Sequence, residues 1–248
     1  MSRLVVSATW DDAPHLDEAT KAQLWNSIPA YQRDARTKGI PQLGSGAIYP
    51  FPESQFKVAI ADEFEPPKHW PRAFGGDCAL SGVTAAAWGA LDRDSDTLYV
   101  YSVYRRSQAE TAVHADAIKA RGVWIPGVMD AADVLDHDRT QFITLYKRHG
   151  LDVMLPDKAV EAGIQDVYDR ISAGRLKVFA SCVAFWDEFR LYQRDERGRV
   201  VKKNDHVLDA VRYLVRTGLR HAKVKPEPKE EVTHLEYEQG RANLTWMQ

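Results

Sequence analysis

The sequence predicts an α/β fold in which a mixed central sheet is flanked by helices. Three strand candidates follow one another from Arg72, and helices and strands then alternate up to about residue 219. Acidic residues end two of these strands and open the last helix. The first two observations predict the fold, and the third indicates where its chemistry lies.

The predicted domain opens with a meander of three strands. Apolar and small residues fill 72–77, 83–91 and 97–104, and the polar turn at 92–96 suits a hairpin. The elements expected after it are a helix at about 107–120, a strand at 123–130, a helix around 142–146 that ends at Gly150, a strand at 151–155, a helix at 160–171 closed by Gly174, a strand at 176–179, a helix around 185–192, a basic hairpin at 194–203 and a last helix from about 207.

Three further zones surround this domain, which is expected to span 72–219. Residues 1–50 contain an apolar strand at 4–8, with no evident sheet to join, and a helix at about 17–31. Residues 51–71 are rich in Pro and acidic side chains and are expected to form a connector. Residues 220–248 form a charged tail that we expect to be flexible, because it lacks enough apolar surface to order itself.

Composition narrows the classes of function. The chain has 248 residues, 44% hydrophobic content and only two cysteines, so a disulfide framework is excluded and a reducing cytoplasm is expected. Neither a signal peptide nor an apolar stretch of membrane-spanning length is present. The formal net charge of −2 gives no overall attraction for nucleic acid, so any DNA contact would need local basic patches.

The order of the elements is that of the ribonuclease H-like fold. In that order the first strand is central and the fourth strand lies beside it. Asp77 at the end of the first strand would then neighbour Asp130 at the end of the fourth. The last helix would bring its first turn, with Asp205, His206 and Asp209, to the same edge.

Carboxylates that converge in this way are typical ligands of Mg²⁺ or Mn²⁺, and a pair of such ions can clamp the attacking and leaving oxygens of a phosphodiester. The leading hypothesis is a metal-dependent nuclease. Its catalytic residues would be Asp77, Asp130 and Asp209, with His206 and Asp209 lining the metal site and Asp205 divided between capping the helix and supporting the ligands.

Each candidate also has a plainer interpretation. Asp77 could start a turn, and Asp130 could cap the next helix. Asp205 suits an ordinary N-cap, Asp209 could lie on a solvated helix face, and His206 could be a surface residue. The basic hairpin could either serve solubility or contact DNA phosphates through Arg194, Arg197, Arg199, Lys202 and Lys203.

The chain also resembles a known family over roughly residues 4–219. The segments that carry the resemblance are Thr9-Trp10-Asp11-Asp12, His15-Leu16, Ala35-Arg36-Thr37-Lys38-Gly39-Ile40-Pro41, Trp70-Pro71-Arg72-Ala73-Phe74-Gly75, Thr84-Ala85-Ala86-Ala87-Trp88-Gly89-Ala90, Trp124-Ile125-Pro126-Gly127, Val160-Glu161-Ala162-Gly163-Ile164 and Asn204-Asp205-His206. Together they resemble the C-terminal nuclease region of the large terminase subunit of tailed bacteriophages. Residues 78–82 and 131–138, beside the first two aspartates, depart from the pattern of the family.

The resemblance implies an endonuclease that cleaves double-stranded DNA during genome packaging in the cytoplasm of the bacterial host. It also implies contacts with an ATPase domain or subunit, a small terminase and the capsid portal. Residues 1–50 would be the end of the ATPase region, since no Gly-x-x-x-x-Gly-Lys-Ser/Thr loop occurs in the sequence. The chain would then be an excised fragment or a nuclease encoded apart from its motor. The alternatives are a non-catalytic packaging or docking module, and another ribonuclease H-like nuclease such as a resolvase.

Overall fold

The computed structural model describes residues 9–27, 37, 46–79, 82–131, 139–195 and 197–227. The strand expected at 4–8 and the tail beyond 227 lie outside the described residues. Helix α1 (Glu18–Ser27) falls within the helix expected at about 17–31, whose last residues are also outside the description.

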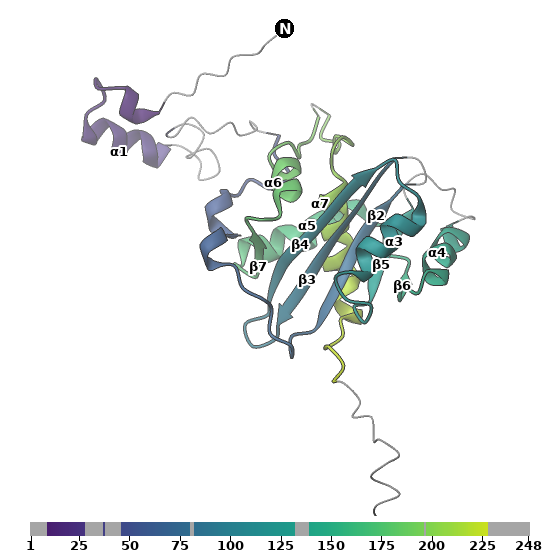
Figure 1. Cartoon of the computed structure of the whole chain (residues 1–248). Helices are drawn as coiled ribbons and strands as arrows, with labels where there is room; N and C mark the ends of the chain where they lie inside the picture. Colours follow the sequence, from purple (N-terminus) through teal and green to yellow (C-terminus); the bar gives the residue numbers. More distant parts are fainter. Residues whose placement is uncertain are drawn as a thin grey trace, which may run out of the picture.

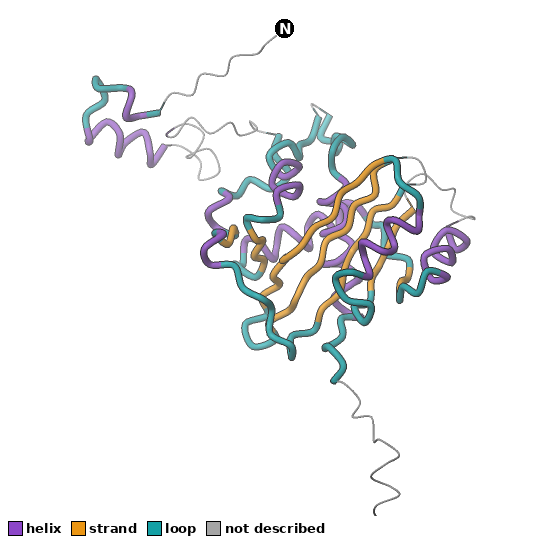
Figure 2. Tube along the Cα trace, in the orientation of Figure 1, coloured by secondary structure: helices purple, strands orange, loops and turns teal. Residues whose placement is uncertain are grey.

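A seven-stranded mixed sheet forms the centre of the fold, with the order β1-β7-β4-β3-β2-β5-β6 (Figures 1 and 2). The strands are β1 (Lys57–Val58), β2 (Arg72–Cys78), β3 (Val83–Asp92), β4 (Thr97–Ser107), β5 (Gly127–Ala131), β6 (Val153–Met154) and β7 (Leu176–Phe179). The pairs β2–β3 and β3–β4 are antiparallel, whereas the other four neighbouring pairs are parallel. The predicted position of the first domain strand, β2, between the second and fourth is therefore confirmed.

Helices cover both faces of this sheet (Figure 1). They are α3 (Thr111–Lys119), α4 (Arg139–Arg148), α5 (Val160–Ser172), α6 (Val183–Phe189) and α7 (His206–Arg216). One apolar core unites α5, α6 and α7 with one face of the sheet, and a second core joins α3 and α4 to the opposite face. Among the described residues, no helix is long and apolar enough to cross a membrane.

Small side chains bring α7 very close to the sheet. Ala73, Ala85 and Ala87 line the face of β2 and β3 beneath it. At Gly75, a Cβ atom would lie only 1.9 Å from the carbonyl oxygen of Ala210 on α7. The helix therefore rests on the strand backbone, and its position over the sheet is closely defined.

The structure changes several predicted boundaries. Strand β4 continues to Ser107 because 105–107 pair with 83–85 of β3, so α3 begins at Thr111 instead of 107. The expected connector contributes β1, which pairs with β7 at the edge of the sheet. The boundary expected at residue 220 for the flexible tail lies too early in the chain. The backbone of Lys223 still exchanges two hydrogen bonds with Arg72 of the sheet.

The basic hairpin is present as a tight turn. Arg194 and Val200 form an isolated antiparallel bridge, and Gly198 has a φ of +76°. The carboxylate of Asp195 organises the turn by accepting hydrogen bonds from the backbone N–H groups of Arg197 and Arg199. This turn leads directly into α7.

Candidate metal centre

Two aspartates from neighbouring strands form the base of the site. In the parallel pairing of β2 with β5, Asp77 lies directly opposite Asp130. Both residues are buried, at 4% and 3% exposure, which excludes a solvated turn for Asp77. The Tyr213 hydroxyl on α7 donates to Oδ2 of Asp130 at 3.1 Å, so Asp130 faces α7. The predicted proximity of these carboxylates is confirmed.

Helix α7 places a histidine next to Asp77. Nδ1 of His206 lies 2.9 Å from Oδ2 of Asp77. Burial raises the pKa of the Asp77 carboxyl. The hydrogen bond to Asp77 raises the pKa of His206. The imidazole is therefore a direct partner of the central carboxylate and not an isolated surface side chain.

Asp209 lies one turn further along α7 and is also buried, at 7% exposure. The interpretation of Asp209 as part of a solvated face is therefore wrong. Nζ of Lys202 lies 3.0 Å from one carboxylate oxygen, and a guanidinium nitrogen of Arg212 lies 3.0 Å from the other. Burial alone would lower the pKa of Lys202, but the charges of Asp209 and Asp205 raise it.

Asp205 occupies the N-cap position of α7, but its side chain does not cap the helix. Its backbone carbonyl accepts the Asp209 N–H at 2.8 Å, whereas its side chain makes no capping hydrogen bond. The carboxylate instead lies 3.2 Å from Nζ of Lys202. The N-cap prediction for Asp205 is therefore wrong. The reason is the local backbone, since ψ of 13° at Asp205 is far from the extended conformation usual for a capping residue.

The site contains two further residues that the sequence did not predict. Nζ of Lys158, in the loop before α5, lies 2.8 Å from Oδ2 of Asp130. Glu188 of α6 accepts hydrogen bonds from the N–H groups of Val207 and Leu208 at the start of α7. Neither belongs to a recognisable motif, and Glu188 sits in an apolar stretch whose pattern predicts only a helix.

The donors at the base of the site fit a hard divalent cation. The two neighbouring carboxylates carry negative charges that repel each other in a buried setting, and Oδ1 of Asp130 is buried without a hydrogen-bond partner among the described residues. Within the described part of the chain, however, no group of three or more His, Cys, Asp or Glu side chains is arranged to hold one ion. Lys202 and Arg212 occupy the oxygens of Asp209, so this third carboxylate is engaged elsewhere.

The basic hairpin is largely neutralised by its own surroundings. Arg194 pairs with Glu161, and Arg199 pairs with Asp195. Lys202 turns toward the carboxylates of the site. Of the five basic residues, only Arg197 and Lys203 have no ion pair with another described residue.

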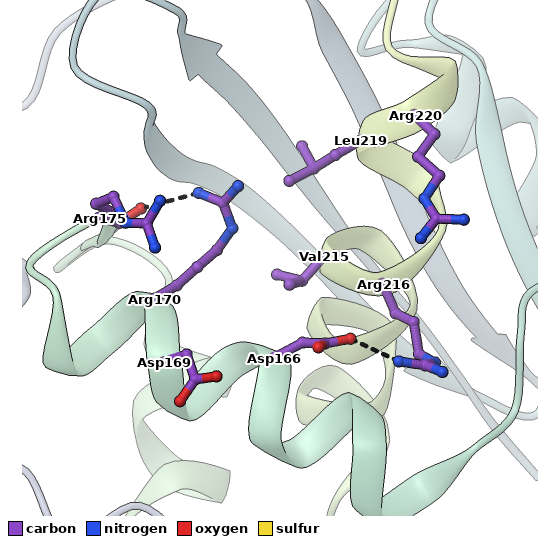
Figure 3. A pocket seen from close by; sticks show the side chains of 8 residues that line it. All are labelled: Asp166, Asp169, Arg170, Arg175, Val215, Arg216, Leu219 and Arg220. Carbon is purple, nitrogen blue, oxygen red and sulfur yellow. Dashed lines mark hydrogen bonds and ion pairs between the residues drawn. The ribbon is translucent and has the colours of Figure 1, made fainter.

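A surface pocket lies at the other end of α7 (Figure 3). Its lining carries four arginines and two aspartates. Arg216 pairs with Asp166, while Arg170 and Arg175 both pair with Asp96 on a neighbouring turn. These ion pairs balance much of the positive charge, so the pocket has the character of a surface charge network.

Comparison with known proteins agrees with this geometry. Residues 74–216 match the family described as the terminase RNaseH-like domain. The chain is 38% identical over 244 residues to the large terminase subunit of Salmonella phage P22, which covers 93% of this chain and 48% of that protein. It is 39% identical over 224 residues to the large terminase subunit of Enterobacteria phage LP7, covering 86% of this chain and 46% of that protein.

Solved structures show the same fold. The nuclease domain of the P22 large terminase superposes with a TM-score of 0.67 at 32% identity, covering 73% of this chain and 96% of that one. The large terminase nuclease of the thermophilic phage G20c, solved with bound magnesium, has a TM-score of 0.53 at 15% identity and covers 71% and 99%. The chain spans about half the length of the two large subunits that it matches. From this family match and these identities, the chain belongs to the terminase ribonuclease H-like domain family.

Proposed function

We propose that this chain is a divalent-metal-dependent endonuclease that cleaves double-stranded DNA during phage genome packaging. The observation that carries the proposal is the pairing of Asp77 with Asp130 beneath the start of α7. Family membership supports the same activity, because the P22 relative is a terminase nuclease domain. The solved G20c relative holds magnesium, which suits the carboxylate chemistry of this site.

In the proposed reaction, Asp77 and Asp130 would hold Mg²⁺ or Mn²⁺, and His206 and Asp209 would complete the site for a pair of ions. The metal would activate water and stabilise the charge that develops on the phosphate. Lys158 and Lys202, which now neutralise Asp130 and Asp209, would turn toward the phosphates when the carboxylates bind metal. His206 beside Asp77 would hold a proton close to the reacting groups.

The partners belong to the proposal as well. An ATPase domain or subunit would supply the motor, and the small terminase and capsid portal would bring DNA and capsid together in the host cytoplasm. Arg197 and Lys203 are the members of the hairpin best suited to contact phosphates, because the other three are already paired within the described residues. Residues 72–219 would be the nuclease domain, with 1–50 as the end of an ATPase-like region and 51–71 as the connector.

Cleavage of supercoiled plasmid tests the activity. We expect nicking and linearisation in Mn²⁺ or Mg²⁺ and none in a chelator. Asp77→Asn should abolish cleavage, because it removes a carboxylate charge from the metal site while preserving its shape. The control is Asp152→Asn, which changes an exposed ion pair with Lys223 and leaves the carboxylates of the site unaltered. Wild-type cleavage by Asp77→Asn would refute the assignment.

A non-catalytic packaging module is the second candidate. The observation that favours it is that protein cations already pair with Asp130 and Asp209, which reduces the need for metal at these carboxylates. Such a module would bind duplex DNA but leave plasmid intact at every metal concentration. The same plasmid assay, combined with a DNA-binding titration, separates the two functions.

A further inference from the structure

Glu188 is a buried carboxylate that the proposed reaction does not use. It lies on α6 with 2% exposure. Its Oε2 accepts hydrogen bonds from the backbone N–H of Val207 at 2.6 Å and of Leu208 at 3.2 Å. A carboxylate from one helix therefore caps the first turn of another, about twenty residues further along the chain.

This contact supplies what the start of α7 lacks. The first N–H groups of a helix have no partners within the helix, and the side chain of Asp205 does not accept from them. A negative charge at this position also interacts favourably with the helix dipole. When Glu188 is ionised, the hydrogen bond that it accepts from Val207 is charge-assisted, and such a bond is stronger than one between neutral groups.

Glu188 also connects α7 to the sheet. Its Oε1 lies 3.1 Å from Nε of Arg105, at the end of β4. The strand registers place Arg105 in one row with Ala85, Asp77 and Asp130 across the sheet. A single buried carboxylate thus joins the edge that carries both aspartates to the helix turn that carries His206. A buried charge in this position needs a counterion, and Arg105 provides one.

We propose that Glu188 is a positioning residue for the metal centre. It fixes the first turn of α7 over Asp77, so that His206 and Asp209 are presented to a divalent cation, and Arg105 serves as its counterion. The proposal rests on the proposed metal-dependent function, since it assigns Glu188 a role at the same site.

The alternative is a purely structural role, in which Glu188 only stabilises the fold. Two substitutions separate these roles. Glu188→Ala removes both accepted hydrogen bonds, whereas Glu188→Gln keeps an amide oxygen for Val207 but loses the charge. Asp187→Asn is the matched control, because it changes the adjacent residue of α6, whose exposed carboxylate pairs with Arg190.

The first measurement is Mn²⁺ affinity, determined by calorimetry on the whole chain without DNA. Removal of a group that orients metal ligands typically weakens affinity by about 10- to 100-fold, and we expect this for Glu188→Ala, with a smaller loss for Glu188→Gln. Asp187→Asn should bind as the wild type does. Hydrogen exchange at the Val207 and Leu208 amides should accelerate in Glu188→Ala, because these donors lose their acceptor.

The second measurement is plasmid cleavage, in which kcat should fall while the KM for DNA stays unchanged, because Glu188 is too deeply buried to contact phosphates. Wild-type Mn²⁺ affinity in folded Glu188→Ala would overturn the proposal, even if its thermal stability had dropped. If Glu188→Ala does not fold, Glu188→Gln decides, and wild-type affinity in that variant would overturn it too. A wild-type chain that binds Mn²⁺ without cutting DNA would refute the proposed function alone, because the affinity comparison would still test Glu188.

Discussion

Gly75 offers a sharp test of how α7 builds the site. This residue lies in β2 two positions before Asp77, beneath the middle of α7. In Gly75→Ala, the new Cβ would lie 1.9 Å from the carbonyl oxygen of Ala210 and 2.7 Å from the backbone nitrogen of Leu214. Both neighbours are helix backbone, so no side-chain rotation can relieve the overlap. The substitution must therefore move α7 away from the strand.

The size of the effect follows from these distances. Restoring ordinary van der Waals separation requires α7 to shift by about 1.5 Å. Overpacking of this kind typically costs about 1–3 kcal/mol in the free energy of unfolding, and we expect the upper end because the obstacle is rigid. A misplacement of about 1 Å can lower a reaction rate by about 100-fold. Cleavage should therefore fall at least that far, since His206 and Asp209 move with the helix.

The matched control is Gly76→Ala, in the same strand but on the opposite face. Its Cβ would meet Cγ of Met129 at 3.1 Å, and this flexible side chain can yield. We expect this variant to remain within about 1 kcal/mol of the wild type and to cleave DNA normally. Urea unfolding and plasmid nicking in Mn²⁺ measure both quantities. Equal stability and activity for the two alanine variants would show that close contact of α7 with β2 does not define the site.

Three further predictions concern charge. Burial raises the pKa of Glu188 from 4.5 to about 7, so the folded protein retains a proton that the unfolded chain releases in this window, and the unfolding free energy falls as pH rises. At 1.36 kcal/mol per pH unit, the loss of unfolding free energy is at most about 3 kcal/mol, and Glu188→Gln should lack this pH dependence. Urea melts of the variant and the wild type between pH 4.5 and 8 measure it. Stabilities that change in parallel with pH would contradict the prediction. Asp209→Asn should lose more cleavage than Asp205→Asn, because within the described residues two cations pair with the Asp209 carboxylate and one pairs with Asp205. The reverse order in kcat would exclude this ranking. Replacing Arg197 and Lys203 with Ala should weaken duplex binding and reduce the magnitude of the slope of log affinity against log salt by about 2. Fluorescence anisotropy measures both, and an unchanged slope would assign both residues to solubility.

Local pattern explains why so much of the fold was predictable. Strand β7 begins and ends at the predicted residues, and α5 and α7 follow their apolar repeats. The order of elements then restricts the topology, because a three-strand meander followed by alternating elements places the first and fourth strands side by side. That adjacency is why the sequence alone predicts the pairing of Asp77 with Asp130.

The predictions failed where long-range pairing overrides local signals. Nothing near Ser107 signals that the strand continues, because the cause is its pairing with Val83 on another strand. Lys223 belongs to a segment of charged composition, yet its backbone pairs with Arg72 at the start of β2. Asp205 has the residue type of an N-cap, but the backbone at this position turns its side chain toward Lys202.

The sequence by itself determined the order of the elements, the family, and the carboxylates that meet at one edge of the sheet. Only the tertiary structure decided which cations neutralise those carboxylates and which residue caps α7. The physical reason is distance along the chain. The contacts of Glu188 with Arg105 and Val207, and of Lys158 with Asp130, join residues whose separation follows no helical or strand repeat. Such contacts arise only when packing has brought the elements together, and they set the electrostatics of the site.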